Sequence, residues 1–163
     1  MSPGTGETSG GNRSPAQDSK GVSTMSNLAE ANGITATMVT ESQRLSILPR
    51  YAGQHMTALE SAIFHAMREY CREYQGGYWY MYELSNGAFY MAPGRDEKLP
   101  MFCAGNYYEG TMSADAAGIV ACLVGFNRLA WKTREQRFVD LFYALRHFAA
   151  YHPESAEIFA AID

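Results

Sequence analysis

The chain has 163 residues, 13 lysines and arginines against 17 aspartates and glutamates, and a formal net charge of −4. This length suits one compact domain, and the hydrophobic content of 47% is sufficient for a real core. The charge argues against a basic protein that binds phosphates. It also argues against a DNA mimic, which needs roughly one negative charge per 1.7 Å of duplex axis. A local patch of either sign stays open.

The cysteines and the apolar runs bear on the compartment. Cys71, Cys103 and Cys122 are odd in number, far apart and without CxxC spacing, and no signal peptide precedes them. This pattern predicts a reduced, cytoplasmic protein. The longest apolar run, residues 116–124, is shorter than the ~20 residues that cross a bilayer, so no membrane span is expected.

The first 24 residues differ in composition from the rest of the chain. Gly, Ser, Thr and Pro dominate residues 1–24, which contain too little apolar surface to offset the entropy of ordering. We predict a disordered tail there and a single domain over residues 25–163. Whether Met25 is the natural start stays open.

The first predicted elements are a strand and a helix. Residues 34–40 are rich in β-branched side chains and predict a short strand, with a sheet edge as one location. Residues 41–53 are expected to form a connector. Residues 55–74 carry an apolar stripe at helical spacing, and Gly76-Gly77 follows it.

The hydrophobic period then changes to two. Strands are expected at 78–84 and 88–92, joined at Asn86-Gly87, a strong hairpin signal because both residues tolerate positive φ. Residues 99–112 predict a second hairpin. We therefore expect a meander of three or four antiparallel strands.

Helical signals return after this meander. Ser113 can cap a helix whose first turn contains Asp115, and residues 116–129 are apolar nearly all round, which predicts a buried helix. Residues 133–136 match a capping box before the next helix, and 154–162 form a short final one. The order of elements predicts an α+β fold, with one small antiparallel sheet packed against about four helices.

Signatures of catalysis and cofactor binding are weak. The sequence contains no HExxH, no GxSxG elbow and no phosphate-binding loop followed by GK[ST]. Glu83 and Glu109 lie on predicted strands and could approach each other as an acid–base pair, but solvated positions on the sheet are the favoured interpretation. We predict no catalytic residue, no cofactor and no metal site, and a structural or surface role for the histidines, which are His55, His65, His147 and His152.

One predicted strand is unusually aromatic. In residues 78–82, Tyr78, Tyr80 and Tyr82 share one face of the strand, while Trp79 and Met81 share the other. One face must cover the helices. The other is either an exposed aromatic surface or part of an ordinary two-sided core. If it is exposed, the lack of nearby basic residues favours a protein partner over nucleic acid.

Four blocks of sequence resemble one family. The family is that of the KlcA/ArdB-type antirestriction proteins. The four blocks occur in the same order as in that family, and they are residues 43–50 (QRLSILPR), 76–93 (GGYWYMYELSNGAFYMAP), 112–119 (MSADAAGI) and 152–163 (HPESAEIFAAID). The resemblance covers residues 34–163. Four ordered blocks are far more specific than any one of them.

The resemblance implies a function that composition does not. Members of the family are carried by plasmids and other mobile elements, and they relieve restriction by type I restriction–modification enzymes, which translocate and cut unmodified DNA. They are not known as enzymes and differ from acidic DNA mimics. The resemblance therefore implies a non-enzymatic inhibitor with an α+β fold.

The expected partner is the type I enzyme or a factor acting with it, without sequence-specific DNA binding. We expect a monomer and leave weak dimerisation open. A DNA-binding accessory factor of plasmid maintenance and a small enzyme are the alternatives. We place the hypothetical partner surface on the exposed side of the hairpin, using Tyr78, Tyr80, Tyr82 and Glu83, with Asp115 nearby.

Overall fold

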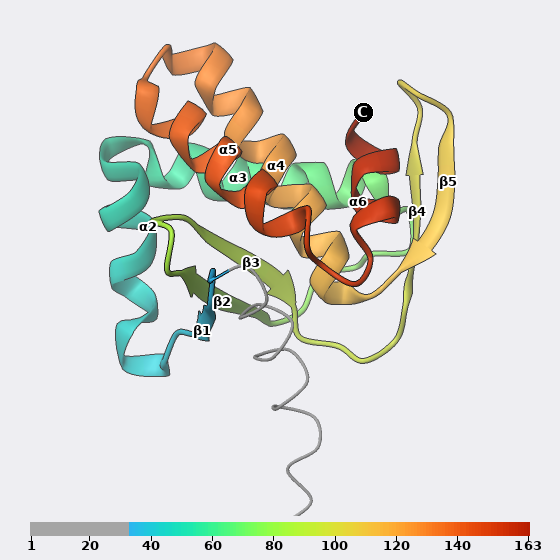
Figure 1. The fold of residues 1–163 in the computed structure, drawn as a ribbon, viewed down its shortest axis with the longest axis horizontal. Coiled ribbons are helices and arrows are strands. Elements are labelled where there is room, and N and C mark those ends of the chain that lie inside the picture. Colours follow the sequence, from blue (N-terminus) through green and yellow to red (C-terminus); the bar gives the residue numbers. More distant parts are fainter. Residues whose placement is uncertain (1–32) are drawn as a thin grey trace, which may run out of the picture.

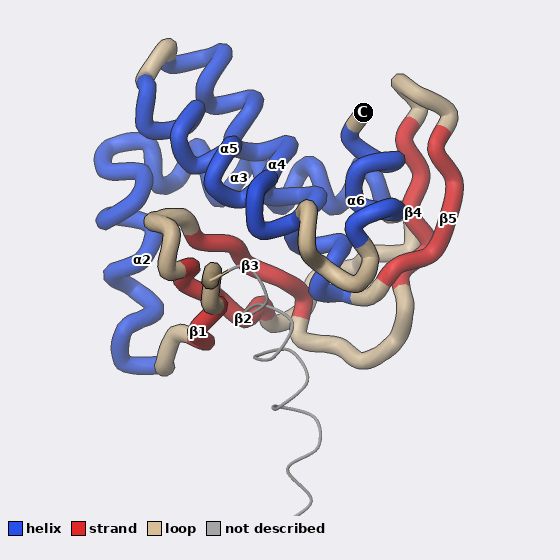
Figure 2. Tube along the Cα trace, viewed as in Figure 1, coloured by secondary structure: helices blue, strands red, loops and turns tan. Residues whose placement is uncertain are grey.

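The computed structural model describes residues 33–163, in which helices pack around two small antiparallel sheets (Figures 1 and 2). The predicted tail over residues 1–24 lies outside the described residues, and the domain expected from residue 25 is described from residue 33 onward. The α+β class predicted from the order of elements is confirmed.

The first sheet has the order β1-β2-β3, with all pairs antiparallel. Its strands are β1 (Ala36–Met38), β2 (Trp79–Leu84) and β3 (Phe89–Pro93). The predicted Asn86-Gly87 hairpin joins β2 to β3, and Gly87 has a φ of +90°, which a residue with a Cβ rarely adopts. The strand β1 pairs with β2 at a sheet edge, which was one of its expected locations.

The second hairpin forms a sheet of its own from β4 (Leu99–Cys103) and β5 (Tyr108–Met112). The expectation of one continuous meander is therefore corrected to two sheets. The free edge of β3 is occupied by a helix: Cys122 Sγ lies 3.3 Å from the backbone nitrogen of Met91, and a Cβ on Gly118 would come within 2.5 Å of Ala92. Because this edge is covered, β4 cannot pair with it.

The segment expected to be a connector is helical. It contains a 3-10 turn, η1 (Glu41–Gln43), then α2 (Arg44–Ala52) and a second 3-10 turn, η2 (Gly53–His55). Although Pro49 lies inside α2, the helix buries Ile47 and Ala52. These tertiary contacts outweigh the weak helical pattern of the sequence.

The helix α3 (Met56–Tyr70) follows as predicted, although it ends earlier than residue 74. The remaining helices are α4 (Ala114–Thr133), α5 (Gln136–Ala149) and α6 (Ser155–Ile162). Figure 1 shows α6 beside β4 and β5, at one side of the molecule, and the first sheet at the other.

The central element of the core is α4, as its nearly uniform apolar sequence predicted. It packs against α3, α5 and β3. Among residues 33–163 it is the one helix long and apolar enough to cross a membrane, and 67% of its apolar stretch is buried inside the fold. Its apolar surface is therefore used mainly by internal packing.

Of the two predicted helix caps, the one at the start of α4 is confirmed and the one at the start of α5 is not. Ser113 is the N-cap, and its Oγ accepts a hydrogen bond from the backbone nitrogen of Ala116 at 3.1 Å. The predicted capping box over 133–136 is wrong. Thr133 ends α4, where its hydroxyl donates to the Leu129 carbonyl at 2.7 Å and accepts from the Glu135 backbone nitrogen at 3.2 Å. The N-cap of α5 is Glu135, whose side chain makes no capping hydrogen bond.

Candidate functional site

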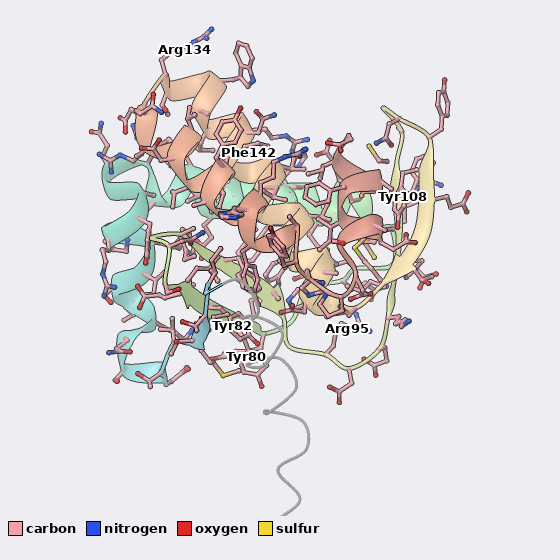
Figure 3. The ribbon with its side chains drawn as sticks, in the orientation of Figure 1. Tyr80, Tyr82, Arg95, Tyr108, Arg134 and Phe142 are labelled. Carbon is pink, nitrogen blue, oxygen red and sulfur yellow. The ribbon has the colours of Figure 1, made fainter. Side chains whose placement is uncertain are left out.

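The aromatic strand presents the alternation that its sequence predicted. Tyr80 and Tyr82 lie on one face of β2, and Tyr78 precedes the strand on the same side; Trp79 and Met81 are buried on the other face. Figure 3 shows Tyr80 and Tyr82 side by side at the end of the molecule that carries the first sheet. We call the surface formed by Tyr78, Tyr80 and Tyr82 the tyrosine face.

The outer end of the tyrosine face is open. Tyr78 is 49% exposed and Tyr80 41% exposed, and their ring centroids lie 5.3 Å apart in an edge-to-face arrangement. Met38 of β1, which pairs with Tyr82 in the register, is also exposed. Aromatic and methionine side chains are the types enriched at protein interfaces.

Two residues that the sequence analysis left in a connector hold Tyr78 in place. Its hydroxyl donates to Glu41 Oε2 at 2.6 Å, and the Arg44 guanidinium carbon lies 4.4 Å from its ring centroid. The hydrogen bond to Glu41 raises the pKa of Tyr78. Neither Glu41 nor Arg44 was predicted, because their helical context was not recognised in the sequence.

The inner end of the tyrosine face, at Tyr82, is covered by Tyr90 of the neighbouring strand β3. The Tyr82 ring is stacked on Tyr90 of β3, with centroids 4.8 Å apart and planes 15° from parallel. Burial is the main reason why the pKa of Tyr82 is raised to about 12. The Tyr90 hydroxyl donates to Asp115 Oδ1 at 2.9 Å, which connects the face to the start of α4.

Asp115 also holds a buried histidine. His152 Nε2 lies 2.9 Å from Asp115 Oδ2, and the His152 side chain is only 6% exposed. The backbone nitrogen of Glu154 donates to His152 Nδ1 at 3.0 Å. Because Nδ1 accepts, the ring proton resides on Nε2 and is donated to Asp115. The sequence gave no sign of this pairing, since the two residues lie 37 positions apart.

The starts of α4 and α6 are joined by the same network. Glu154 accepts from the Ser113 backbone nitrogen at 2.9 Å, and the Ser113 hydroxyl donates to the same carboxylate. Ser113, His152 and Asp115 are thus near neighbours, but both ring nitrogens of His152 are already bonded to other groups. A serine nucleophile needs a histidine nitrogen to take its proton, so this arrangement positions helix ends and does not activate Ser113.

Glu83 requires a correction. It was grouped with the tyrosines, yet it lies on the opposite face of β2 because side chains alternate along a strand. Its Oε1 accepts from Arg50 Nη1 at 2.5 Å and from the Tyr51 hydroxyl at 2.7 Å. Glu109 belongs to the second sheet, so the alternative of a carboxylate pair with Glu83 has no support in the geometry.

Within residues 33–163, no group of three His, Cys, Asp or Glu side chains is arranged to hold a metal ion. The fold and the candidate site define a small α+β protein with a partly exposed aromatic face, backed by a partly buried polar network. A family model described as antirestriction protein matches residues 72–163, which include all five candidate residues. The chain belongs to this family.

Two relatives match this chain over nearly their whole length. The chain is 43% identical to Antirestriction protein KlcA from Escherichia coli, over 80% of this chain and 95% of the relative. It is 37% identical to Uncharacterized protein YafX from Escherichia coli (strain K12), over 86% of this chain and 97% of the relative. The resemblance predicted from the four sequence blocks is thereby confirmed.

A solved structure supports the fold. It matches with a TM-score of 0.76 and 43% identity, covering 80% of this chain and 96% of the solved one. That work on KlcA and ArdB describes a novel fold and antirestriction activity against type I DNA restriction systems in vivo but not in vitro.

Proposed function

We propose that this protein relieves restriction of incoming DNA by type I restriction systems in the cytoplasm. The observation that carries the proposal is the likeness to the KlcA structure, at 43% identity over 96% of that chain. At this identity and coverage, the core, the tyrosine face and the polar network occupy a fold shared with proteins that have this activity in vivo.

The inhibition is proposed to act through binding, with no catalytic step. The Asp115–His152 pair resembles part of a catalytic site, but His152 is buried and both of its ring nitrogens are bonded. DNA mimicry is not proposed, because a net charge of −4 is far below the charge density of a duplex.

The proposed partner is the type I enzyme or a cellular factor that acts with it. KlcA and ArdB are described as active in vivo but not in vitro, and a requirement for a component missing from purified reactions would explain that difference. We propose that this chain has the same requirement and acts as a monomer.

The open end of the tyrosine face is proposed as the contact surface. Tyr78 and Tyr80 present large rings to solvent, and tyrosines immobilised in this way bind partners at a low cost in side-chain entropy. Tyr82 and Asp115 support this surface from behind, through Tyr90. Glu83 is left out of the contact because it is bonded to α2 on the other face.

A plating assay tests the function. Cells with an active type I system, with or without this protein, are challenged with unmodified phage, and a parallel strain contains a type II enzyme. We expect rescue in the type I strain alone. Rescue in both strains would point to general protection of DNA, and no rescue with folded protein present would reject the proposal.

The contact surface is tested with Tyr80→Ser. Because the Tyr80 ring is 41% exposed, we expect relief to fall while the thermal midpoint changes little. The matched control is Tyr107→Ser, since Tyr107 is 88% exposed and lies at the tip of the β4–β5 hairpin. Equal relief by both variants would contradict the role of the tyrosine face.

A further inference from the structure

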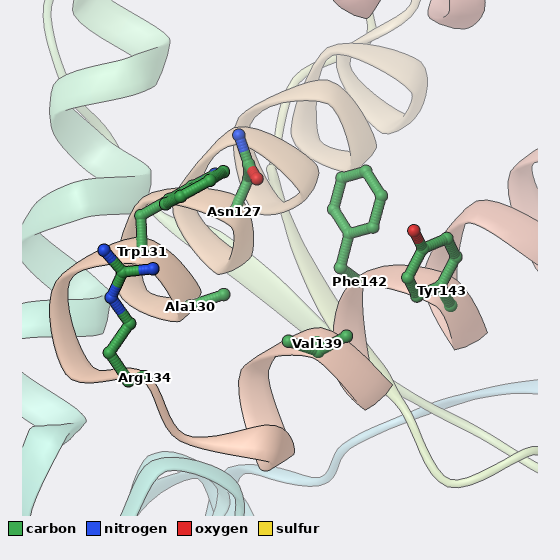
Figure 4. Close-up of a pocket in the computed structure, with 7 residues that line it drawn as sticks. All are labelled: Asn127, Ala130, Trp131, Arg134, Val139, Phe142 and Tyr143. Carbon is green, nitrogen blue, oxygen red and sulfur yellow. The ribbon is translucent and has the colours of Figure 1, made fainter.

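A second aromatic surface lies at the other end of the molecule, between α4 and α5. It is a groove of about 370 Å³ (Figure 4). Trp131 and Arg134 line one side, Phe142 and Tyr143 line the other, and Ala130 and Val139 lie between them. Its centre is therefore apolar, and its sides carry the residue types that dominate protein binding sites.

The two largest rings of the groove are exposed to water. Trp131 is 65% exposed and Tyr143 is 64% exposed, whereas the other tryptophan, Trp79, is buried in the core. An exposed indole contributes little to folding, since most of its apolar surface stays in water. The exposure of both rings beside an apolar groove marks a surface suited to a partner.

Arg134 adds a positive edge to the groove. It is the C-cap of α4 and has a φ of +61°, in the left-handed region where glycine is the usual residue. Its guanidinium carbon lies 5.0 Å from the centroid of the Trp131 ring. An arginine occupies a backbone position that glycine would occupy with less strain, and its charge is held against the indole.

The charge of this region is opposite to that of the whole chain. Residues 127–146 contain five cations and two carboxylates, in a chain whose net charge is −4. Three of the cations are paired, Arg128 with Glu69, Arg137 with Glu135 and Arg146 with Asp163. Lys132 and Arg134, at the C-terminal end of α4, form no ion pair with another described residue, and of these two only Arg134 lines the groove.

We propose that this groove is a second docking surface, and that its partner is an acidic protein segment with an apolar anchor side chain. The anchor fits between Trp131 and Phe142, and a carboxylate meets Arg134, which lines the groove. This inference rests on the proposed function, since the segment would belong to the restriction machinery or to the factor acting with it. Figure 3 places Arg134 and the tyrosine face at opposite ends of the molecule, so the two surfaces contact different parts of the partner.

Nucleic acid is a poorer match to the groove. Proteins that follow a nucleic-acid backbone neutralise several phosphates, whereas Arg134 is the one cation among the described residues that line the groove. The surface beside it is formed by aliphatic and aromatic carbon. A carboxylate beside an apolar anchor side chain matches both the single cation and this apolar surface.

The plating assay with groove variants tests the inference. In Arg134→Gly the charge is removed and the left-handed backbone becomes easier to adopt, so the thermal midpoint should stay unchanged or rise. In Trp131→Ser the exposed ring is removed. We expect each variant to lower relief of type I restriction by about tenfold. Lys98→Glu, a charge change in the exposed loop before β4, is the control and should leave relief unchanged.

The outcomes separate the two proposals. If the unaltered protein gives no relief, the proposed function fails. If it and Lys98→Glu relieve restriction and both groove variants do so equally well, the function stands and the docking surface is rejected. A loss of relief in Arg134→Gly with an unchanged thermal midpoint supports the groove, because unfolding does not explain it.

The chemistry of the partner is tested separately by tryptophan fluorescence. The probes are a peptide of Glu and Leu at amphipathic helical spacing, the same peptide with Lys in place of Glu, and an oligothymidylate. Because Trp79 is buried, Trp131 should give the response, and Trp131→Phe is the blank. We expect the acidic peptide alone to change the emission, and Arg134→Gly to weaken this change. Equal responses to both peptides, or a stronger response to the oligothymidylate, would overturn the assignment of an acidic protein partner.

Discussion

The two ends of the tyrosine face differ in what surrounds the same type of side chain. At the inner end, Tyr90 is stacked between Tyr82 and Phe148, and its hydroxyl is bonded to Asp115. At the outer end, Tyr78 and Tyr80 contact each other edge to face and are otherwise open to solvent on one side. The covering helices, rather than the residue type, decide whether a tyrosine supports the fold or is free for a partner.

This difference has consequences for substitutions. Removing the acceptor of a buried hydrogen-bond donor lowers stability by about 1–3 kcal/mol, because the buried donor cannot form a replacement hydrogen bond with water. A substitution at an exposed position usually changes stability by less than about 0.5 kcal/mol. The inner end should therefore respond in unfolding experiments, and the outer end should respond in assays of function.

The largest effect on the inner end is expected from Gly118→Ala. A Cβ there would lie 2.5 Å from Ala92 Cα and from the Met91 carbonyl oxygen, both backbone atoms, so α4 must move away from β3. Asp115, one turn earlier on α4, would move away from Tyr90. We expect a loss of about 3 kcal/mol in the free energy of unfolding, measured with urea.

Gly105→Ala is the matched control for Gly118→Ala. The nearest atom to its new Cβ would be Cys103 Sγ at 3.9 Å, an ordinary contact, so stability should hardly change. Alanine is favoured over glycine inside helices by about 1 kcal/mol. If Gly118→Ala stabilised the protein by that amount, the close packing of α4 on β3 would be wrong.

The second largest effect is expected from Asp115→Ala, at about 2 kcal/mol. The change leaves the Tyr90 hydroxyl and His152 Nε2 without their acceptor in a buried place. A double-mutant cycle with Tyr90→Phe measures the coupling between the two side chains in urea unfolding. We expect Tyr90→Phe to lower the free energy of unfolding clearly less in the Asp115→Ala background than in the unaltered protein. If the two losses simply add, the hydrogen bond between these side chains contributes nothing to stability.

The secondary-structure elements that form the inner end were predicted from the sequence, but the hydrogen bonds that connect them were not. The Asn86-Gly87 hairpin, the buried α4 and the Ser113 cap were all predicted, because each has a local signal within a few residues. The bond between Asp115 and His152 has no local signal. It depends on how α4 and the loop before α6 meet in space.

Two failures of prediction have different causes. The helix α2 was missed because Pro49 interrupts its pattern, while the contacts that stabilise it, such as Arg44 with the Trp79 carbonyl at 2.5 Å, come from a distant strand. Glu83 was assigned to the tyrosine face although alternation along β2 excludes it. Here the signal is local, because the odd-numbered position of Glu83 places it on the face of Trp79 and Met81.

Alkaline pH should destabilise the protein in part through the inner end of the tyrosine face. Tyrosine in an unfolded chain ionises near pH 10, and burial raises the pKa of Tyr82 to about 12 in the folded protein. A pKa raised by folding gives stability that is fully present below about pH 10 and is lost as the pH rises to about 12. We expect the free energy of unfolding to fall across this window.

Tyr82→Phe isolates that contribution. The variant keeps the ring on Tyr90 and removes the ionisable hydroxyl, so its stability should decline less steeply between about pH 10 and 12 than that of the unaltered protein. Urea unfolding at a series of pH values provides the comparison. Identical slopes would mean that Tyr82 ionises as it does in the unfolded chain, and that the inner end is more open than its packing indicates.

The smallest effect is expected from Tyr78→Phe, at the outer end. The change removes the hydrogen bond to Glu41 but keeps the ring under the Arg44 guanidinium. Since Tyr78 is 49% exposed, stability should change by less than about 0.5 kcal/mol in urea unfolding. Restriction relief should persist if the partner contacts the ring. A loss of stability close to that of Asp115→Ala would instead show that the Tyr78–Glu41 bond closes the outer end as Tyr90–Asp115 closes the inner one, and the tyrosine face would then have no free end to offer a partner.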